Sequence, residues 1–258
     1  MDNAASHRNV RLSVNVNKVA TLRNSRGGRA PSVIDAVRVS VANGAPGITV
    51  HPRSDARHIT SADVREIARE LRGHKGTVEY NIEGDPRPDL LAMVKDVRPD
   101  QCTLVPVRAG EITSQAGWPS DSPLAAMRDV VKGLRDAGVR VSMFVDPEPA
   151  AVKWAASIGA DRVELYTEPY ARAFEAGSES AAGSFGRYIA AAVLAHELGL
   201  GVNAGHDLDL KNLTLFRTLP HLAEVSIGHA LISHALFVGL DRAVRDYLAA
   251  VRAPSAAR

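Results

Sequence analysis

The strongest constraint on how this chain folds is a repeated alternation of short apolar runs with amphipathic segments. The run Gly47–Val50 is β-branched and apolar, as in a buried strand, and 61–71 has the three-to-four-residue apolar period of a helix. This pairing occurs eight times along the chain. The predicted strands are 12–16, 47–50, 77–80, 102–105, 140–145, 162–166, 201–203 and 224–227. The predicted helices are 31–41, 61–71, 88–97, 123–137, 149–158, one ending near 198, 208–219 and 231–251.

Eight alternating pairs indicate a parallel sheet, because parallel strands need crossover connections and the crossover helices cover the sheet. We therefore predict an α/β fold, a single (β/α)8 TIM barrel with extra short helices, over residues 1–258. Residues 1–10 are expected to form a polar arm and 254–258 a flexible tail. An open doubly wound sheet is the alternative, but its Gly-x-Gly-x-x-Gly motif is missing after the first strand.

The composition excludes several classes of protein. Hydrophobic residues make up 45% and charged residues 23%, which is typical of a soluble globular protein. The 31 Lys and Arg residues are dispersed and the formal net charge is only +2, so we expect no nucleic-acid partner. No stretch reaches the roughly 18 consecutive apolar residues of a membrane span. The single cysteine, Cys102, permits no internal disulfide and is expected to be a small core residue, so a cytoplasmic location is predicted.

Barrel enzymes place their active sites at the carboxyl ends of the strands, so the residues that follow each strand are the candidates. His51, Arg53 and His58 follow the second strand, and a histidine there can transfer protons near neutral pH. Glu79 in the third strand is flanked by apolar residues and is expected to point into the barrel mouth, where burial would raise its pKa. Glu83 is expected to lie on the surface instead.

Basic and glycine-rich segments near other strand ends suggest anion sites. A polar loop, 17–30, is expected after the first strand, and Lys or Arg residues there could hold an anionic substrate. Gly205-His206 and Gly228-His229 end the seventh and eighth strands and resemble phosphate cradles, with ordinary turn glycines as the alternative. Glu164 is either an inward site residue or an ion partner in the barrel core. No His-x-His or His-Glu-x-x-His spacing occurs, so no metal is expected.

Two stretches lack a regular period. Residues 111–122 are expected to be either a lid over the site or a solvated crossing loop. Residues 167–185 are expected to form a short extra helix or a subunit contact.

Four segments resemble the signatures of the pyridoxine 5'-phosphate synthase (PdxJ) family, and the match is colinear from about residue 12 to 250. They are 15–27 (NVNKVATLRNSRG), 47–53 with 57–59 (GITVHPR and RHI), 202–206 (VNAGH) and 227–230 (IGHA). The resemblance implies a metal-free barrel without a cofactor that assembles as a homo-octamer. It also implies condensation of 1-deoxy-D-xylulose 5-phosphate with 3-amino-2-oxopropyl phosphate, which builds the pyridine ring of vitamin B6 and releases phosphate.

The resemblance also implies roles for individual residues. His51 is similar to the proton acceptor of the family, Glu79 to its catalytic carboxylate and His206 to its proton donor. Positions that bind substrate or its phosphate, or that line the site, are matched by Arg26, Arg53, His58, Thr113, Glu164, Gly228 and His229.

The chain departs from the commoner family pattern at substrate-contacting positions. The commoner Asn-Ile-Asp-His is here Asn15, Val16, Asn17 and Lys18, and the commoner Pro-Glu-Lys at 106–108 is Pro-Val-Arg. The glycine after His206 is Asp207, whose charge would repel a phosphate unless Lys18 or an arginine compensates.

We interpret the chain as a divergent branch that keeps the reaction. A paralogous phosphate-binding barrel enzyme with another substrate is the main alternative. A metal-dependent barrel hydrolase and a non-catalytic binding protein for phosphorylated metabolites are also open. The histidines such a hydrolase would use are His51, His58, His206 and His229.

Overall fold

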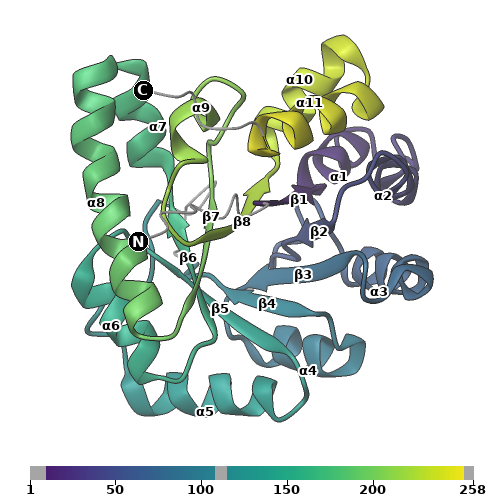
Figure 1. Ribbon diagram of the computed structural model, residues 1–258. Coiled ribbons are helices and arrows are strands. Elements are labelled where there is room, and N and C mark those ends of the chain that lie inside the picture. The colour runs from purple at the N-terminus through teal and green to yellow at the C-terminus, as the bar shows by residue number, and fades with distance from the viewer. Residues whose placement is uncertain (1–9, 108–114, 253–258) are drawn as a thin grey trace.

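The computed structural model describes residues 10–107 and 115–252, and eight parallel strands in it close into a barrel in chain order (Figure 1). The predicted TIM barrel is therefore confirmed. The strands are β1 (Arg11–Asn15), β2 (Gly47–Val50), β3 (Glu79–Gly84), β4 (Gln101–Leu104), β5 (Arg140–Val145), β6 (Arg162–Tyr166), β7 (Gly201–Gly205) and β8 (Leu222–Ile227). The predicted arm and tail lie almost wholly outside the described residues.

Helices surround the barrel and cover the outer face of the strands (Figure 1). The helices of the first half are α1 (Asn17–Asn24), α2 (Val33–Ala42), α3 (Ser61–Leu71), α4 (Pro88–Val97) and α5 (Leu124–Arg135), with a 3-10 turn at Arg72–His74. Those of the second half are α6 (Pro149–Ser157), α7 (Glu168–Glu175), α8 (Ser178–Glu197), α9 (Leu213–Phe216), α10 (His229–Val238) and α11 (Leu240–Arg252). None of the helices in the described ranges has both the length and the apolar composition needed to cross a bilayer.

Several helix boundaries differ from the prediction. The polar loop predicted at 17–30 begins with α1, because no glycine or proline interrupts residues 17–24. The predicted helix 231–251 is divided into α10 and α11 by Gly239, whose φ of 87° lies in the left-handed region. The short extra helix expected within 167–185 is α7. The predicted helix 208–219 is reduced to the four residues of α9.

The strands have an apolar outer face and a polar inner face. Leu12, Ile48 and Ile82 are fully buried residues of the hydrophobic core between barrel and helices. Inside the barrel, the Ser13 and Thr49 hydroxyls lie 2.6 Å apart, and the Thr103 hydroxyl donates to the side chain of Asn81 at 3.1 Å. Because buried polar groups are costly unless hydrogen-bonded, these contacts let a polar interior remain folded.

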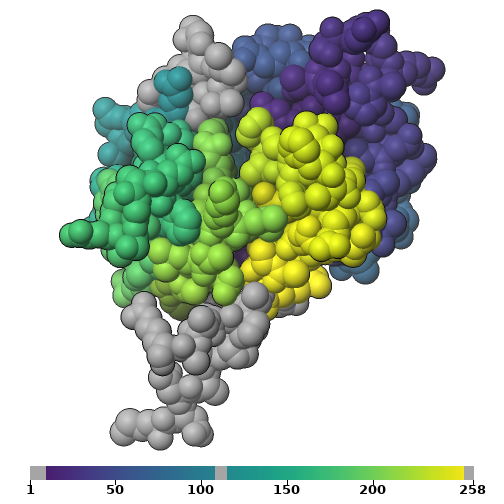
Figure 2. Space-filling view, turned by 90° about the horizontal axis from the view of Figure 1, so that it is seen from above, coloured from purple at the N-terminus to yellow at the C-terminus, as the bar shows by residue number. Residues whose placement is uncertain are grey.

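The first and last strands of the barrel meet where it closes, and so do helices from the two halves of the chain. Strand β8 pairs with β1, and α11 packs against α2 and β1. Figure 2 shows the same arrangement on the surface, where the yellow C-terminal helices lie beside the purple N-terminal segment. Helices α1 and α10 are also in contact. The loops after β1 and β8 are therefore neighbours at the barrel mouth.

Candidate active site

The carboxyl ends of the strands bring together most of the predicted site residues from opposite ends of the chain. His51 follows β2, His206 and Asp207 follow β7, and Gly228 and His229 follow β8. Lys18 in α1 acts electrostatically on both His58 and Asp207, so the first, second and seventh strand ends face one common space. That convergence is what the strand-end rule for barrels predicts.

The centre of the mouth holds a buried histidine and a buried carboxyl group. His51 Nδ1 lies 3.9 Å from Oε2 of Glu83, and Nε2 of His51 is buried without a hydrogen-bond partner. Burial lowers the pKa of His51 to about 3, and the charges of His58, Arg53 and Arg87 add to the effect. Burial also raises the pKa of Glu83 well above its usual range, with Glu164 and Glu224 contributing. At neutral pH, His51 is therefore a neutral base, and it lies beside a carboxyl group whose burial favours the protonated form.

The structure corrects the prediction for Glu79. Strand β3 begins at Glu79 and runs to Gly84, whereas the predicted strand ended at Tyr80. Glu79 consequently lies at the opposite end of the barrel, where its carboxylate binds Arg140 at 2.5 Å and lies 3.6 Å from Arg11. The prediction that Glu83 is a surface residue is also wrong, because it is 9% exposed.

The period-2 alternation of a strand could have revealed that Glu83 faces the barrel interior and not the surface. Glu79, Asn81 and Glu83 alternate with apolar residues, so all three face the barrel interior once the strand is extended to Gly84. Of these three residues, Glu83 lies at the mouth and Glu79 lies at the opposite rim of the barrel.

Two asparagines, one at the end of β1 and one at the start of α1, fix the start of the His51 loop. Asn15 Oδ1 accepts a hydrogen bond from the Asn17 backbone at 3.0 Å, and Asn17 Oδ1 accepts one from the His51 backbone at 2.9 Å. Asn17 thus keeps a positioning contact through its amide oxygen. Gly228 leaves the room this arrangement needs, because a Cβ there would approach Asn15 Cβ within 3.1 Å.

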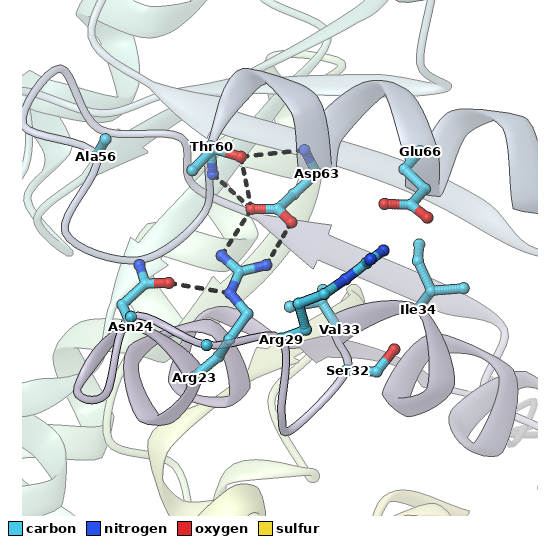
Figure 3. A pocket seen from close by; sticks show the side chains of 12 residues that line it. Arg23, Asn24, Arg29, Ser32, Val33, Ile34, Ala56, Thr60, Asp63 and Glu66 are labelled. Atoms are coloured by element: carbon cyan, nitrogen blue, oxygen red, sulfur yellow. Dashed lines mark hydrogen bonds and ion pairs between the residues drawn. The ribbon is translucent and has the colours of Figure 1, made fainter.

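The loop of His58 is held from α1, next to a cavity of about 540 Å³ (Figure 3). Arg23 binds both carboxylate oxygens of Asp63, at 2.5 and 2.9 Å, and Asn24 Nδ2 donates to the His58 carbonyl at 2.9 Å. Asp63 also caps α3 by accepting hydrogen bonds from the backbone and hydroxyl of Thr60 at 2.8 Å. Burial lowers the pKa of the His58 imidazole to about 4, assisted by Arg53 and Lys18.

The loop after β7 has an unusual backbone. His206 and Asp207 have φ values of 88° and 59°, a region that non-glycine residues rarely adopt. His206 Nδ1 lies 2.8 Å from the Asp207 carboxylate, and its ring packs edge-on against Tyr166 at 5.2 Å. The next helix, α9, is four residues long and begins only at Leu213, so the cradle predicted at Gly205-His206 has no helix N-terminus beside it.

The end of β8 does lead into a helix. Gly228 is the N-cap of α10, whose first residue is His229, so the free amide groups of the first helical turn begin at the mouth. This geometry agrees with the cradle predicted for Gly228-His229. Gly205 makes room for Glu164, because a Cβ at position 205 would come within 2.4 Å of the Glu164 carboxylate.

Glu164 lies inside the barrel. It is buried, and burial together with the nearby Glu224 raises its pKa to about 8. Burial and Glu79 raise the pKa of Glu224 to about 7, although Arg162 opposes this. A column of carboxyl groups, Glu83, Glu164 and Glu224, therefore lines the interior.

Some predicted residues are not brought into the mouth by described contacts. Arg26 is exposed just beyond α1, and Thr113 lies outside the described residues, as does part of the predicted lid 111–122. Its described part packs on the barrel, because Trp118 Nε1 donates to the Leu104 carbonyl at 2.9 Å and its ring stacks with Trp154 at 6.1 Å. Within 10–107 and 115–252, no three His, Cys, Asp or Glu side chains converge as ligands for a metal ion.

A closed eight-stranded barrel with a buried base and carboxyl group at the carboxyl ends of its strands defines an enzyme of the TIM-barrel class. Comparison with known families then gives a specific result. The pattern of the family described as pyridoxal phosphate biosynthesis protein PdxJ matches residues 12–253, and the chain belongs to this family.

Curated relatives cover nearly the same length. The chain is 48% identical over 239 residues to pyridoxine 5'-phosphate synthase of Cytophaga hutchinsonii, covering 92% of this chain and 97% of the relative. It is 50% identical over 238 residues to the enzyme of that name from Bacteroides thetaiotaomicron, again covering 92% and 97%.

Solved structures of low identity share the fold alone. KGPDC from Streptococcus mutans superposes with a TM-score of 0.63 at 12% identity, covering 94% of this chain and 97% of the other. A tryptophan synthase alpha subunit from Pyrococcus furiosus gives 0.60 at 13% identity, with the same coverage.

Proposed function

We propose that this enzyme condenses 1-deoxy-D-xylulose 5-phosphate with 3-amino-2-oxopropyl phosphate to form pyridoxine 5'-phosphate, with release of phosphate and water. Membership of the PdxJ family supports this reaction. The structural observation that carries it is the buried pair of His51 and Glu83 at the barrel mouth. Amine addition, dehydration and ring closure each move protons. This pair supplies a neutral base and, 3.9 Å away, a carboxyl group whose burial favours the protonated form.

Each titratable group in the mouth has a proposed task. His51 accepts a proton, since its unpartnered buried Nε2 is free to meet a substrate. Glu83 replaces Glu79 as the catalytic carboxyl group, because Glu79 lies at the other end of the barrel. His206 is proposed as the proton donor from the opposite side of the mouth. Their distribution over three strands suits a substrate that is protonated and deprotonated at several atoms.

Two phosphorylated substrates need two anion sites. We propose the first at the N-terminus of α10, where Gly228 and the amides from His229 onward can bind phosphate oxygens. We propose the second beside the loop after β2, where the charges of Arg53 and Lys18 both act on His58. Asn15, Asn17 and Asp207 line the space between these sites.

The direct test is incubation of the purified protein with both substrates, without added metal or cofactor. We expect pyridoxine 5'-phosphate and inorganic phosphate in equal amounts, measured by chromatography and a phosphate assay. Binding of either substrate without product would instead favour a paralogue with another reaction, as the Lys18 and Asp207 departures allow. Activity that requires an added metal ion would favour the hydrolase alternative.

We further propose that the protein assembles as a homo-octamer. An exposed apolar group supports self-association, since Leu236 and Phe237 at the end of α10 are 70% and 88% exposed and Leu22 lies on the adjacent α1. Light scattering should therefore report eight chains, and Phe237→Lys should give smaller particles. A monomeric wild-type protein would refute the assembly. A cytoplasmic location is proposed as well, because its charged substrates do not cross a bilayer unaided.

A further inference from the structure

We propose that Asp207 is a positioning residue that holds the His206 imidazole with Nδ1 as the donor and Nε2 facing the substrate. The role of His206 as proton donor rests on the function proposed above, whereas the His206-Asp207 contact stands on the structure itself. Nδ1 of His206 lies 2.8 Å from Oδ2 of Asp207, so the carboxylate accepts the Nδ1 proton. The other ring nitrogen then remains the one that can exchange a proton with a ligand.

The second face of the imidazole is also constrained. Tyr166, the last residue of β6, packs edge-on against it with ring centroids 5.2 Å apart and planes at 76°. Asp207 holds one ring nitrogen of His206 and Tyr166 packs against the ring, so the two contacts together hold the imidazole in one orientation. A ring held in this way keeps its alignment throughout a proton transfer.

The backbone shows that this loop is built to bring the two side chains together. Left-handed φ angles at two successive non-glycine residues persist only where the surroundings fix them. The Thr167 hydroxyl donates to the Gly205 carbonyl at 2.7 Å and also to the His206 carbonyl. Asn212 Nδ2 donates to the Asp207 carbonyl at 2.9 Å. Side chains from two other segments thus hold the carbonyl groups of this turn.

The charges around Asp207 explain how a carboxylate is tolerated beside a phosphate site. The hydrogen bond from His206 lowers the pKa of Asp207, partial burial opposes this, and the charges of His229 and Lys18 lower it further. Asp207 is therefore ionised at neutral pH, and basic groups from β7, α10 and α1 face it. Lys18, which stands where the commoner pattern has histidine, supplies the compensating charge.

Asp207→Asn keeps the size of the side chain and removes the charge. Without the carboxylate, nothing at Nδ1 holds the His206 ring in one tautomer and orientation, so Nε2 faces the substrate in a smaller share of the molecules. We therefore expect kcat to fall about tenfold. KM for both substrates should change less than about twofold, since the binding groups remain.

Two further variants separate positioning from folding. Asp207→Gly removes the carboxylate but suits the left-handed backbone, so the same loss of kcat is expected without a lower Tm. Asp209→Asn is the matched control, because Asp209 caps the amides of Lys211 and Asn212 at 2.9 and 2.8 Å in the same loop. It should lower Tm and leave kcat unchanged.

A measurement that does not depend on turnover completes the test. Nitrogen-15 spectra of the His206 ring, assigned with His206→Asn, should show a protonated Nδ1 at high pH in the wild type and loss of that preference in Asp207→Gly. Identical ring signals and equal kcat values in wild type, Asp207→Asn and Asp207→Gly would overturn the positioning role. Altered ring signals in a protein that makes no pyridoxine 5'-phosphate would uphold it and reject the proposed function.

Discussion

Replacing Glu83 with glutamine should lower kcat by a factor of about 10² to 10⁴, because the substitution removes a proton that the reaction uses while keeping the shape of the side chain. Glu83 is buried beside His51, and burial raises its pKa, which favours the form that carries this proton. Substrate binding should persist, so equilibrium titration should give dissociation constants within about threefold of wild type. Steady-state kinetics with both substrates measures the loss.

Glu79→Gln is the matched control for this experiment. The two glutamates belong to the same strand and face the same barrel interior, but Glu79 lies at the far rim, where it binds Arg140 and Arg11. Its substitution should leave kcat nearly unchanged and reduce the free energy of unfolding by about 1–3 kcal/mol, because the arginines lose a partly buried partner. A large loss of kcat in Glu79→Gln, with Glu83→Gln active, would reverse the assignment made from the structure.

Replacing Asp63 with alanine should reduce the free energy of unfolding by about 3–5 kcal/mol, because it leaves the largely buried Arg23 without its carboxylate partner and removes half of the capping box of α3. The change in the midpoint of urea unfolding measures this loss. Asp63→Asn should cost less, since an amide oxygen can still accept from Thr60.

The stability that Asp63→Ala loses should depend on pH, and the pKa of Asp63 gives the direction. Burial raises the pKa of Asp63, but the bonds from Arg23 and Thr60 outweigh it and the net shift is downward. The stabilisation is therefore complete above the unfolded pKa of about 3.9 and is lost as the pH falls through the lower folded value. The difference in the free energy of unfolding between wild type and Asp63→Ala should be largest at pH 7 and smaller near pH 3.

Asp35→Ala is the matched control at an exposed position. Asp35 occupies the same position in α2 as Asp63 does in α3, but its side chain is 70% exposed and its contact with Arg38 is 3.4 Å long. Exposed ion pairs contribute about 0–1 kcal/mol, so we expect a loss of that size at most. Equal losses in the two alanine variants would show that the buried contact of Asp63 with Arg23 adds nothing.

The sequence by itself determined the eight-stranded barrel, because the apolar period of each strand and helix is a local property that survives in the one-dimensional pattern. It also predicted that His51, His206 and the Gly228-His229 turn lie at the barrel mouth, since each directly follows a strand and the barrel rule places strand ends there. Strand β2 and helices α3 and α4 have the predicted bounds for the same reason.

Only the tertiary structure decided which carboxyl group reaches the mouth. Glu79 and Glu83 are inward residues of one strand, and the choice depends on where β3 starts relative to β2, with Gly47 opposite Glu79 and Val50 opposite Ile82. That register is a non-local property, fixed by pairing and by the ion pair of Glu79 with Arg140, a residue 61 positions away. The contact of His206 with Asp207 likewise depends on two backbone angles held by Thr167 and Asn212, which no period in the sequence encodes.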